Sequence, residues 1–176
     1  MEILKNNIEK ICSFYVSDWH LVTMLLPYIN KQINEKANII TILENNIENN
    51  VKTLVSKLNL KNKEEILNLD WTEKKLLKYS DIKNIMNKLK SDNIKNVIFV
   101  NGNINYVNSI NENINKYLKI LNNNLEKINK GINIKIINCF EVSEFNLNVH
   151  DILKKHDKIL NTSGEREIND VFEDYA

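Results

Sequence analysis

Short apolar runs alternate with helix-forming segments along the chain, and this alternation constrains the fold more than any other feature. Five runs occur, at residues 11–16, 39–43, 66–70, 97–100 and 132–140. Each is followed by a segment whose apolar residues recur every three or four positions, as in a helix with one buried face. The pattern predicts an α/β fold with a mostly parallel sheet of five or more strands, covered by helices on both faces. Residues 1–176 contain no internal repeat or linker and are predicted to form one domain.

Capping residues help to place the first helices. Ser17 or Asp18 is expected to cap the helix after the first run, and Pro27 must lie in the first turn of that helix or kink it. Ser80 is expected to cap a later helix, and Gly131 to end a long helix over residues 104–130. The long helix has near-heptad apolar spacing, which would suit a homodimer, although packing on its own sheet explains the same spacing.

The C-terminal part of the chain is predicted to be helical. Ile159 and Leu160 continue the helical spacing that begins at Val149. Thr162 and Glu165 have the spacing of a capping box. This box would start a last helix, whose apolar residues are Ile168, Val171, Phe172 and Tyr175.

Composition and charge exclude several classes of protein. The net charge is +1, and lysines alternate with acids and asparagines, so no basic stripe indicates nucleic-acid binding. No apolar run approaches eighteen residues and the N-terminus opens no signal peptide, which predicts a cytoplasmic protein without membrane association. The two cysteines, Cys12 and Cys139, lie in apolar runs and are predicted to be buried thiols.

The histidines and cysteines do not have the spacing of a metal site. No pair has the spacing C-x-x-C or H-x-x-x-H, and His150 and His156 are six residues apart. We therefore expect no metal and no cofactor. His156 follows Ile152 by four residues and is predicted to be a histidine at the edge of the core with a hydrogen-bonded partner.

Six polar or aromatic residues follow the predicted strands and would gather at the sheet edge where parallel strands end. Two indoles together with carboxylates can line a pocket for a small molecule or a peptide. The alternative is a structural role for each: a helix cap for Asp18, a strand-end turn for Asn101, and packing at the edge for the tryptophans. The candidate ligand-binding residues are Asp18, Trp19, Glu44, Asp70, Trp71 and Asn101.

Two blocks of sequence suggest a family. The first comprises Lys-Ile-Cys-Ser-Phe-Tyr at 10–15, Leu-Leu-Pro-Tyr-Ile at 25–29 and the run 39–43; the second comprises Ile-Asn-Cys-Phe-Glu-Val-Ser-Glu-Phe at 137–145 and residues 151–160. In order and spacing they resemble the MEDS domain, the methanogen/methylotroph DcmR-type sensory domain. Asp157 departs from the pattern, because the family more often has proline there, and the middle of the chain matches weakly. The resemblance implies a RecA/KaiC-like core whose phosphate-binding loop has degenerated, used in signal sensing beside transcription factors or histidine kinases.

The residues at the first turn agree with a degenerated phosphate site. The segment 16–21 has neither the glycines nor the lysine of a phosphate-binding loop, and Asp18 would repel a phosphate. Asn101 stands where the resemblance implies an acidic metal-holding residue. Glu44 resembles the catalytic glutamate position of KaiC-like ATPases, but a single carboxylate does not make a catalytic site.

The leading expectation is a non-catalytic sensing or regulatory domain in signal transduction or transcriptional control. It would bind a small ligand or a protein partner such as a histidine kinase or a transcription regulator. One alternative is a residual nucleotide-binding protein or ATPase of the RecA/KaiC type that uses Glu44. The other alternative is a pure protein-interaction module.

Overall fold

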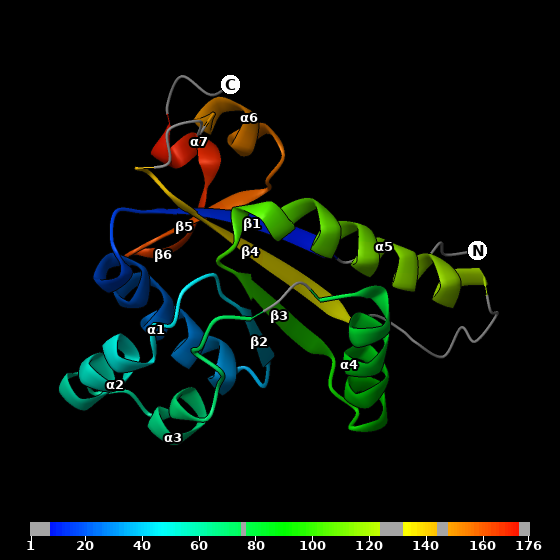
Figure 1. Cartoon of the computed structure of the whole chain (residues 1–176), viewed down its shortest axis with the longest axis horizontal. Coiled ribbons are helices and arrows are strands. Elements are labelled where there is room, and N and C mark those ends of the chain that lie inside the picture. Colours follow the sequence, from blue (N-terminus) through cyan, green and yellow to red (C-terminus); the bar gives the residue numbers. More distant parts are fainter. Residues whose placement is uncertain (1–7, 75–76, 124–131, 144–147, 173–176) are drawn as a thin grey trace.

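The computed structural model describes residues 8–74, 77–123, 132–143 and 148–172 (Figure 1). Its centre is a six-stranded sheet in the order β2-β3-β4-β1-β5-β6, in which neighbouring strands are parallel except for the antiparallel pair β5 and β6. The predicted α/β architecture is confirmed. The strands are β1 (Ile8–Tyr15), β2 (Asn38–Ile42), β3 (Asn96–Asn101), β4 (Asn133–Glu141), β5 (Lys158–Asn161) and β6 (Gly164–Glu167).

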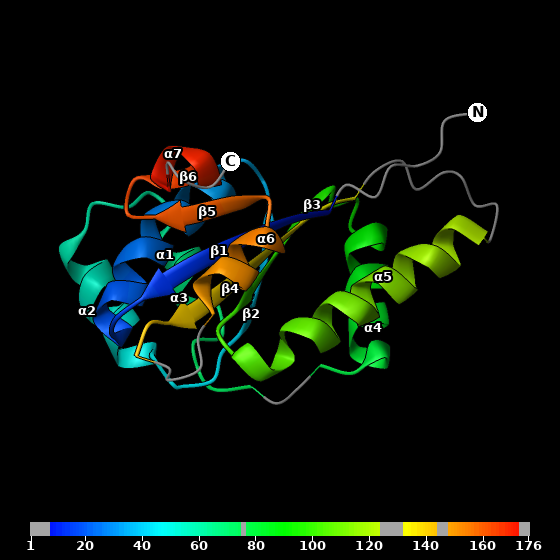
Figure 2. The same ribbon diagram turned by 90° about the horizontal axis from the view of Figure 1, so that it is seen from above.

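Helices cover both faces of the sheet. Figure 2 shows α1, α2 and α3 on one side and α4 and α5 on the other. The helices are α1 (Asp18–Asn34), α2 (Glu48–Lys57), α3 (Lys63–Leu67), α4 (Tyr79–Ser91), α5 (Val107–Asn123), α6 (Val149–Lys154) and α7 (Ile168–Val171), with a 3-10 turn η1 (Ile104–Tyr106) before α5.

The strand residues alternate between two apolar cores. Successive side chains of a strand point to opposite faces, so Ile136 of β4 packs in the cluster under α4 and α5, while Ile137 packs in the cluster under α1, α2 and α3. A smaller cluster lies between the sheet and α6 and α7, and includes Cys12 and Phe140. Phe99 is fully buried, and burial of such a side chain contributes about 1.5–3 kcal/mol.

The strand predicted at residues 66–70 is wrong. Residues 63–67 form the short helix α3, in which the Ile66 amide donates to the Asn62 carbonyl. The run has only three apolar residues, and the good helix formers Lys-Glu-Glu precede it. Ile66 is buried, but against α1 and α2 rather than in the sheet.

The prediction for the C-terminal part is partly wrong: residues 149–154 and 168–171 are helical, as α6 and α7, but the residues between them are not. Ile159 and Leu160 belong to strand β5, and the chain then turns back into β6 instead of entering a helix through a capping box. Gly164 has a φ of +98°, a conformation that favours glycine and closes the turn. Glu165 lies on β6, so its carboxylate is not part of a helix cap. Ile168 begins the four-residue helix α7, and Tyr175 lies outside the described residues.

The helix ends are partly as predicted. Ser17 caps α1, and its hydroxyl accepts a hydrogen bond from the His20 amide at 3.2 Å. Pro27 lies in the interior of α1, with its ring exposed, rather than in the first turn. Ser80 does not cap α4; Lys78 precedes the helix, and its amide donates to the Asp81 carboxylate at 2.9 Å. The predicted end of α5, with Leu125, Ile128 and Gly131, lies outside the described residues.

Candidate functional site

The edge where the parallel strands end, the carboxyl edge, was predicted to hold the site. Here the turn after β1 leads into α1, with Asp18 in the first helical turn. Two backbone amides of this turn are already hydrogen-bonded: Val16 N donates to His20 Nδ1 at 3.0 Å, and Leu21 N donates to the Ser17 carbonyl at 3.0 Å. Because these donors are taken and Asp18 is acidic, the turn offers a phosphate little attraction.

Of the six predicted residues, the structure brings Asp18 and Glu44 together. Both line a crevice at the carboxyl edge, with Tyr15 and Gly102 among its other walls. The crevice has a volume of about 10 Å³, which is roughly the space for the centre of one water molecule. It is too small for a metabolite or a nucleotide in this conformation.

Three of the other predicted residues have structural roles. Trp71 is buried, and its indole N–H donates to the Ile66 carbonyl at 2.7 Å. Asp70 is exposed; the Thr72 hydroxyl donates to its carboxylate, and this bond is the main cause of the lowered pKa of Asp70. Asn101 is fully buried, and its side-chain amide donates to Asn138 at 3.0 Å.

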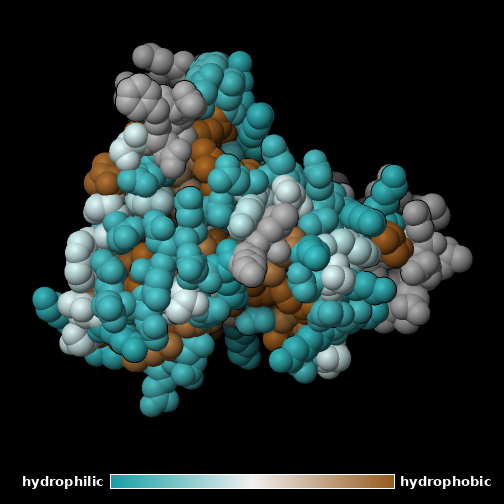
Figure 3. Space-filling view, viewed as in Figure 1, coloured by the Kyte–Doolittle hydropathy of each residue, from teal (hydrophilic) through white to brown (hydrophobic). Residues whose placement is uncertain are grey.

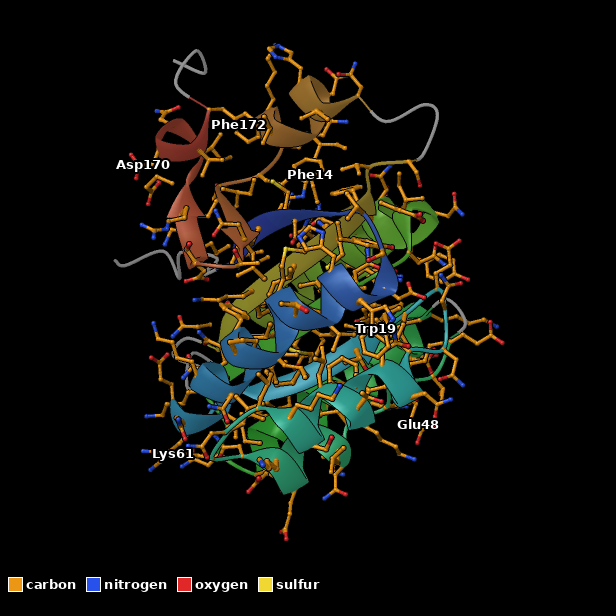
Figure 4. All side chains as sticks on the ribbon, turned by 90° about the vertical axis from the view of Figure 1, so that its left-hand side faces the viewer. Phe14, Trp19, Glu48, Lys61, Asp170 and Phe172 are labelled. Atoms are coloured by element: carbon orange, nitrogen blue, oxygen red, sulfur yellow. The ribbon has the colours of Figure 1, made fainter. Side chains whose placement is uncertain are left out.

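Trp19 is the sixth residue, and half of its surface, 50%, is exposed. It lies at the start of α1, apart from Phe14 and Phe172, which lie near α6 and α7 (Figure 4). Val16 is also exposed and lies three residues before Trp19 in the chain. Val142 is exposed as well and lies beside the end of β1, where its N–H donates to the carbonyl of Tyr15. We refer to these three exposed residues, Val16, Trp19 and Val142, as the apolar patch of the carboxyl edge.

Asn101 belongs to a buried polar chain that crosses three segments. Asn138 accepts the hydrogen bond from Asn101 and lies 3.0 Å from Nε2 of His156, whose Nδ1 is bonded to the Ile152 carbonyl. Burial lowers the pKa of His156, so its neutral form is favoured. The prediction of a hydrogen-bonded histidine at the edge of the core is confirmed, although His156 lies beyond the end of α6.

A much larger cavity lies at the opposite edge of the sheet, where the parallel strands begin. Its volume is about 540 Å³, within the range of small-molecule sites. It is bounded by the starts of β1, β3 and β4 and by the end of α1. Its apolar walls are Ile8, Ala37, Val97, Ile98 and Ile134. Its polar walls are Glu9, Gln32, Glu35, Asn96, Asn133 and Lys135.

An ion network connects this cavity to β5 and β6. Lys135 Nζ donates to Glu165 Oε1 at 2.9 Å and lies 4.0 Å from Glu9 Oε1, while Lys158 Nζ lies 3.5 Å from Glu9 Oε2. The Tyr28 hydroxyl also donates to Glu165 Oε1 at 2.9 Å. Burial raises the pKa of Glu165, but the bonds from Lys135 and Tyr28 outweigh this effect, so its pKa lies below the ordinary value.

Sequence reasoning missed the cavity because it considered only residues that follow strands. The lining comes from residues that precede or begin strands, where the sequence has no recognisable motif. One signal was present: Lys135 is a charged residue between Ile134 and Ile136 in a central strand, and such a residue needs a partner.

Metal and membrane sites are not found in the described part of the chain. Within it, no group of three or more His, Cys, Asp or Glu side chains is arranged to hold a metal ion. Among the described residues, no helix combines the length and the apolar character needed to cross a membrane. Cys12 and Cys139 are free and buried, and burial raises the pKa of each thiol to about 12. Both thiols are therefore held in the protonated, unreactive form.

Comparison with known proteins finds no matching family model, no matching curated protein and no matching solved structure. The resemblance to the MEDS domain therefore stays a prediction from the residues. The function must be inferred from the geometry of the two sheet edges.

Proposed function

We propose that this chain is a non-catalytic regulatory domain that binds a small molecule in the cavity at the amino edge of the sheet. The observation that carries the proposal is the contrast between the two edges. The cavity at the amino edge has a volume of about 540 Å³, and the crevice at the carboxyl edge about 10 Å³. The mixture of apolar walls and a few polar groups is typical of small-molecule sites.

The same contrast argues against a catalytic nucleotide site. An ATPase needs free amides around the phosphates, a lysine and an acidic residue that holds Mg²⁺. The turn after β1, residues 16–21, has no lysine and two of its amides are already bonded, and the end of β3 carries the buried Asn101. Mg²⁺-dependent ATP turnover that is abolished by Glu44→Gln would contradict the proposal.

The MEDS-like resemblance supports a role in signal sensing, in which ligand binding changes how the domain contacts a partner such as a histidine kinase or a transcription regulator. We further propose a cytoplasmic location, since two free buried thiols are usual in a reducing compartment.

The proposal is tested by screening small metabolites with ligand-observed NMR and then measuring affinities by calorimetry. Asn133 is exposed at the cavity rim, so Asn133→Trp should obstruct the cavity without disturbing the core. We expect Asn133→Trp to abolish binding, and Asn49→Trp on the exposed face of α2 to leave it unchanged. Ligands whose binding survives Asn133→Trp would refute the assignment of the cavity.

A second candidate function is protein interaction through the apolar patch of the carboxyl edge. The patch residues Val16, Trp19 and Val142 are 62%, 50% and 44% exposed. Figure 3 shows a mostly hydrophilic surface over α1 and α2, with apolar areas between. Exposed aromatic and aliphatic side chains of this kind favour a partner surface. Trp19→Ala should weaken partner binding in this case and should not change small-molecule binding.

A further inference from the structure

The charged groups of the cavity at the amino edge are not balanced within its lining. Glu9 and Glu35 are its acidic residues, and Lys135 is its basic residue. The ammonium of Lys135 donates to Glu165 at 2.9 Å, and Glu165 is not part of the lining. The charge of Lys135 is therefore largely used outside the cavity. Glu9 is paired with Lys158, so among the described residues the carboxylate of Glu35 is the acidic group of the lining without an ionic partner.

Glu9 lacks hydrogen-bond donors for one of its oxygens. Its Oε2 lies 3.5 Å from Lys158 Nζ. Its Oε1 is buried and accepts no hydrogen bond from the described residues, because the Lys135 ammonium, at 4.0 Å, is too far away for one. A buried carboxylate oxygen without a donor is unfavourable, and a charged donor supplied by a ligand would remove that cost.

Glu35 places a second carboxylate at the mouth of the cavity. It is exposed, and its side chain forms no hydrogen bond or ion pair with any residue in the described ranges. It follows the last residue of α1, so the negative end of the helix dipole lies on the same side. Lys31 and Lys36 of this helix end are exposed and do not line the cavity.

The apolar walls define the rest of the ligand. Ala37, Val97 and Ile98 lie on the lining with the two carboxylates. We propose that the cavity binds an amphiphilic amine, whose apolar body packs on these walls and whose ammonium group is bound by Glu9 and Glu35. This inference rests on the proposed function, because it requires that the cavity is a ligand site.

Three probes of similar shape and different charge test the ligand class: 2-phenylethylamine as the cation, 2-phenylethanol as the neutral compound and 3-phenylpropionate as the anion. Each is titrated into the ¹⁵N-labelled full chain at neutral pH, and amide shifts are followed. We expect the amine to bind most tightly and to shift the amides of Gln32, Ala37 and Ile98. We expect Glu9→Gln and Glu35→Gln each to weaken its binding by about tenfold, the effect of losing one charge-assisted hydrogen bond.

Glu48→Gln is the matched control, since Glu48 lies on α2 outside the lining and is paired with Lys52 at 3.2 Å. It should leave the affinity unchanged. Glu35→Gln keeps the test decisive if Glu9→Gln impairs folding, because Glu35 is exposed and contributes no side-chain bond to the fold.

The outcomes separate the ligand class from the proposed function. Tighter binding of the alcohol or the carboxylate, blocked by Asn133→Trp, would refute the amine and leave the cavity as a ligand site. Amine binding that is unaffected by both Glu→Gln variants would also refute the ligand class. If none of the three probes shifts the amides at the cavity, the amine proposal fails, and small-molecule binding in the cavity then depends on the metabolite screen alone.

Discussion

Removal of the Tyr28 hydroxyl tests whether a hydrogen bond holds the C-terminal hairpin, formed by β5 and β6, against α1. Tyr28 is 5% exposed, and its O–H donates to Glu165 Oε1 at 2.9 Å. Tyr28→Phe removes this donor and keeps the ring. A hydrogen bond to a charged group contributes about 1.5–3 kcal/mol. Glu165 keeps its bond to Lys135, and its side chain is 21% exposed, so water can partly replace the lost hydroxyl. We therefore expect Tyr28→Phe to lower the free energy of unfolding by about 1–2 kcal/mol at pH 7.

The penalty should depend on pH, because the pKa of Glu165 lies below its ordinary value of 4.5. A carboxyl with a lowered pKa in the folded state stabilises the fold fully above the ordinary pKa. That stabilisation is lost as the pH falls through the lowered value. The penalty of Tyr28→Phe should therefore be constant above about pH 5 and should shrink in stronger acid.

Urea denaturation followed by circular dichroism measures this effect. With an m-value of about 2 kcal/mol per molar urea, the midpoint should fall by about 0.5–1 M. Tyr106→Phe is the matched control, because no hydrogen bond of the Tyr106 hydroxyl is found among the described residues. An equal loss of stability in both variants, or a loss from Tyr28→Phe that is as large when Glu165 is already glutamine, would contradict this role of the hydrogen bond.

Three further predictions concern buried groups. Burial lowers the pKa of His156 from 6.5, so the free energy of unfolding should decrease as the pH falls below about 6.5, and His156→Asn should flatten this dependence in urea titrations. Trp71→Phe removes the 2.7 Å hydrogen bond to the Ile66 carbonyl and leaves a small void, so differential scanning calorimetry should show a loss of about 2 kcal/mol and a Tm lower by about 4–8 °C. Cys12 and Cys139, with pKa values of about 12, should react with an aromatic disulfide reagent only as fast as the protein unfolds; rapid labelling of the native protein would contradict their burial.

The parts of the fold that sequence periodicity predicted are those in which burial decides the structure. The runs that became β1, β2, β3 and β4 are apolar on both faces, as central parallel strands are, and their boundaries agree within a few residues. Helices α1 and α2 have apolar residues at helical spacing on their buried faces.

The errors arose where short apolar segments fit more than one structure. Ile66 lies in the short helix α3 and is buried there. Its spacing to Leu67 and Leu69 fits a short helix and a strand equally well. Ile159 and Leu160 are two adjacent apolar residues that continue a helical pattern by chance. The glycine in Thr-Ser-Gly at 162–164 was the local sign of the hairpin.

The site was only partly predictable, because a cavity results from how separate elements meet. Asp18 and Glu44 do meet at the carboxyl edge, as their positions after β1 and β2 require. The register of β1 on β4 places Glu9 beside Lys135, and the end of α1 brings Gln32 to them. Neither the strand register nor the position of the helix end follows from the individual residues.

In the proposed function, the ligand binds where the parallel strands begin. A crystal structure of the chain with the tightest-binding compound from the screen tests it most directly. We expect density for the compound in the cavity between the starts of β1, β3 and β4 and the end of α1, in contact with Glu9. Density at the turn of residues 16–21, or an empty cavity in a saturated crystal, would contradict it.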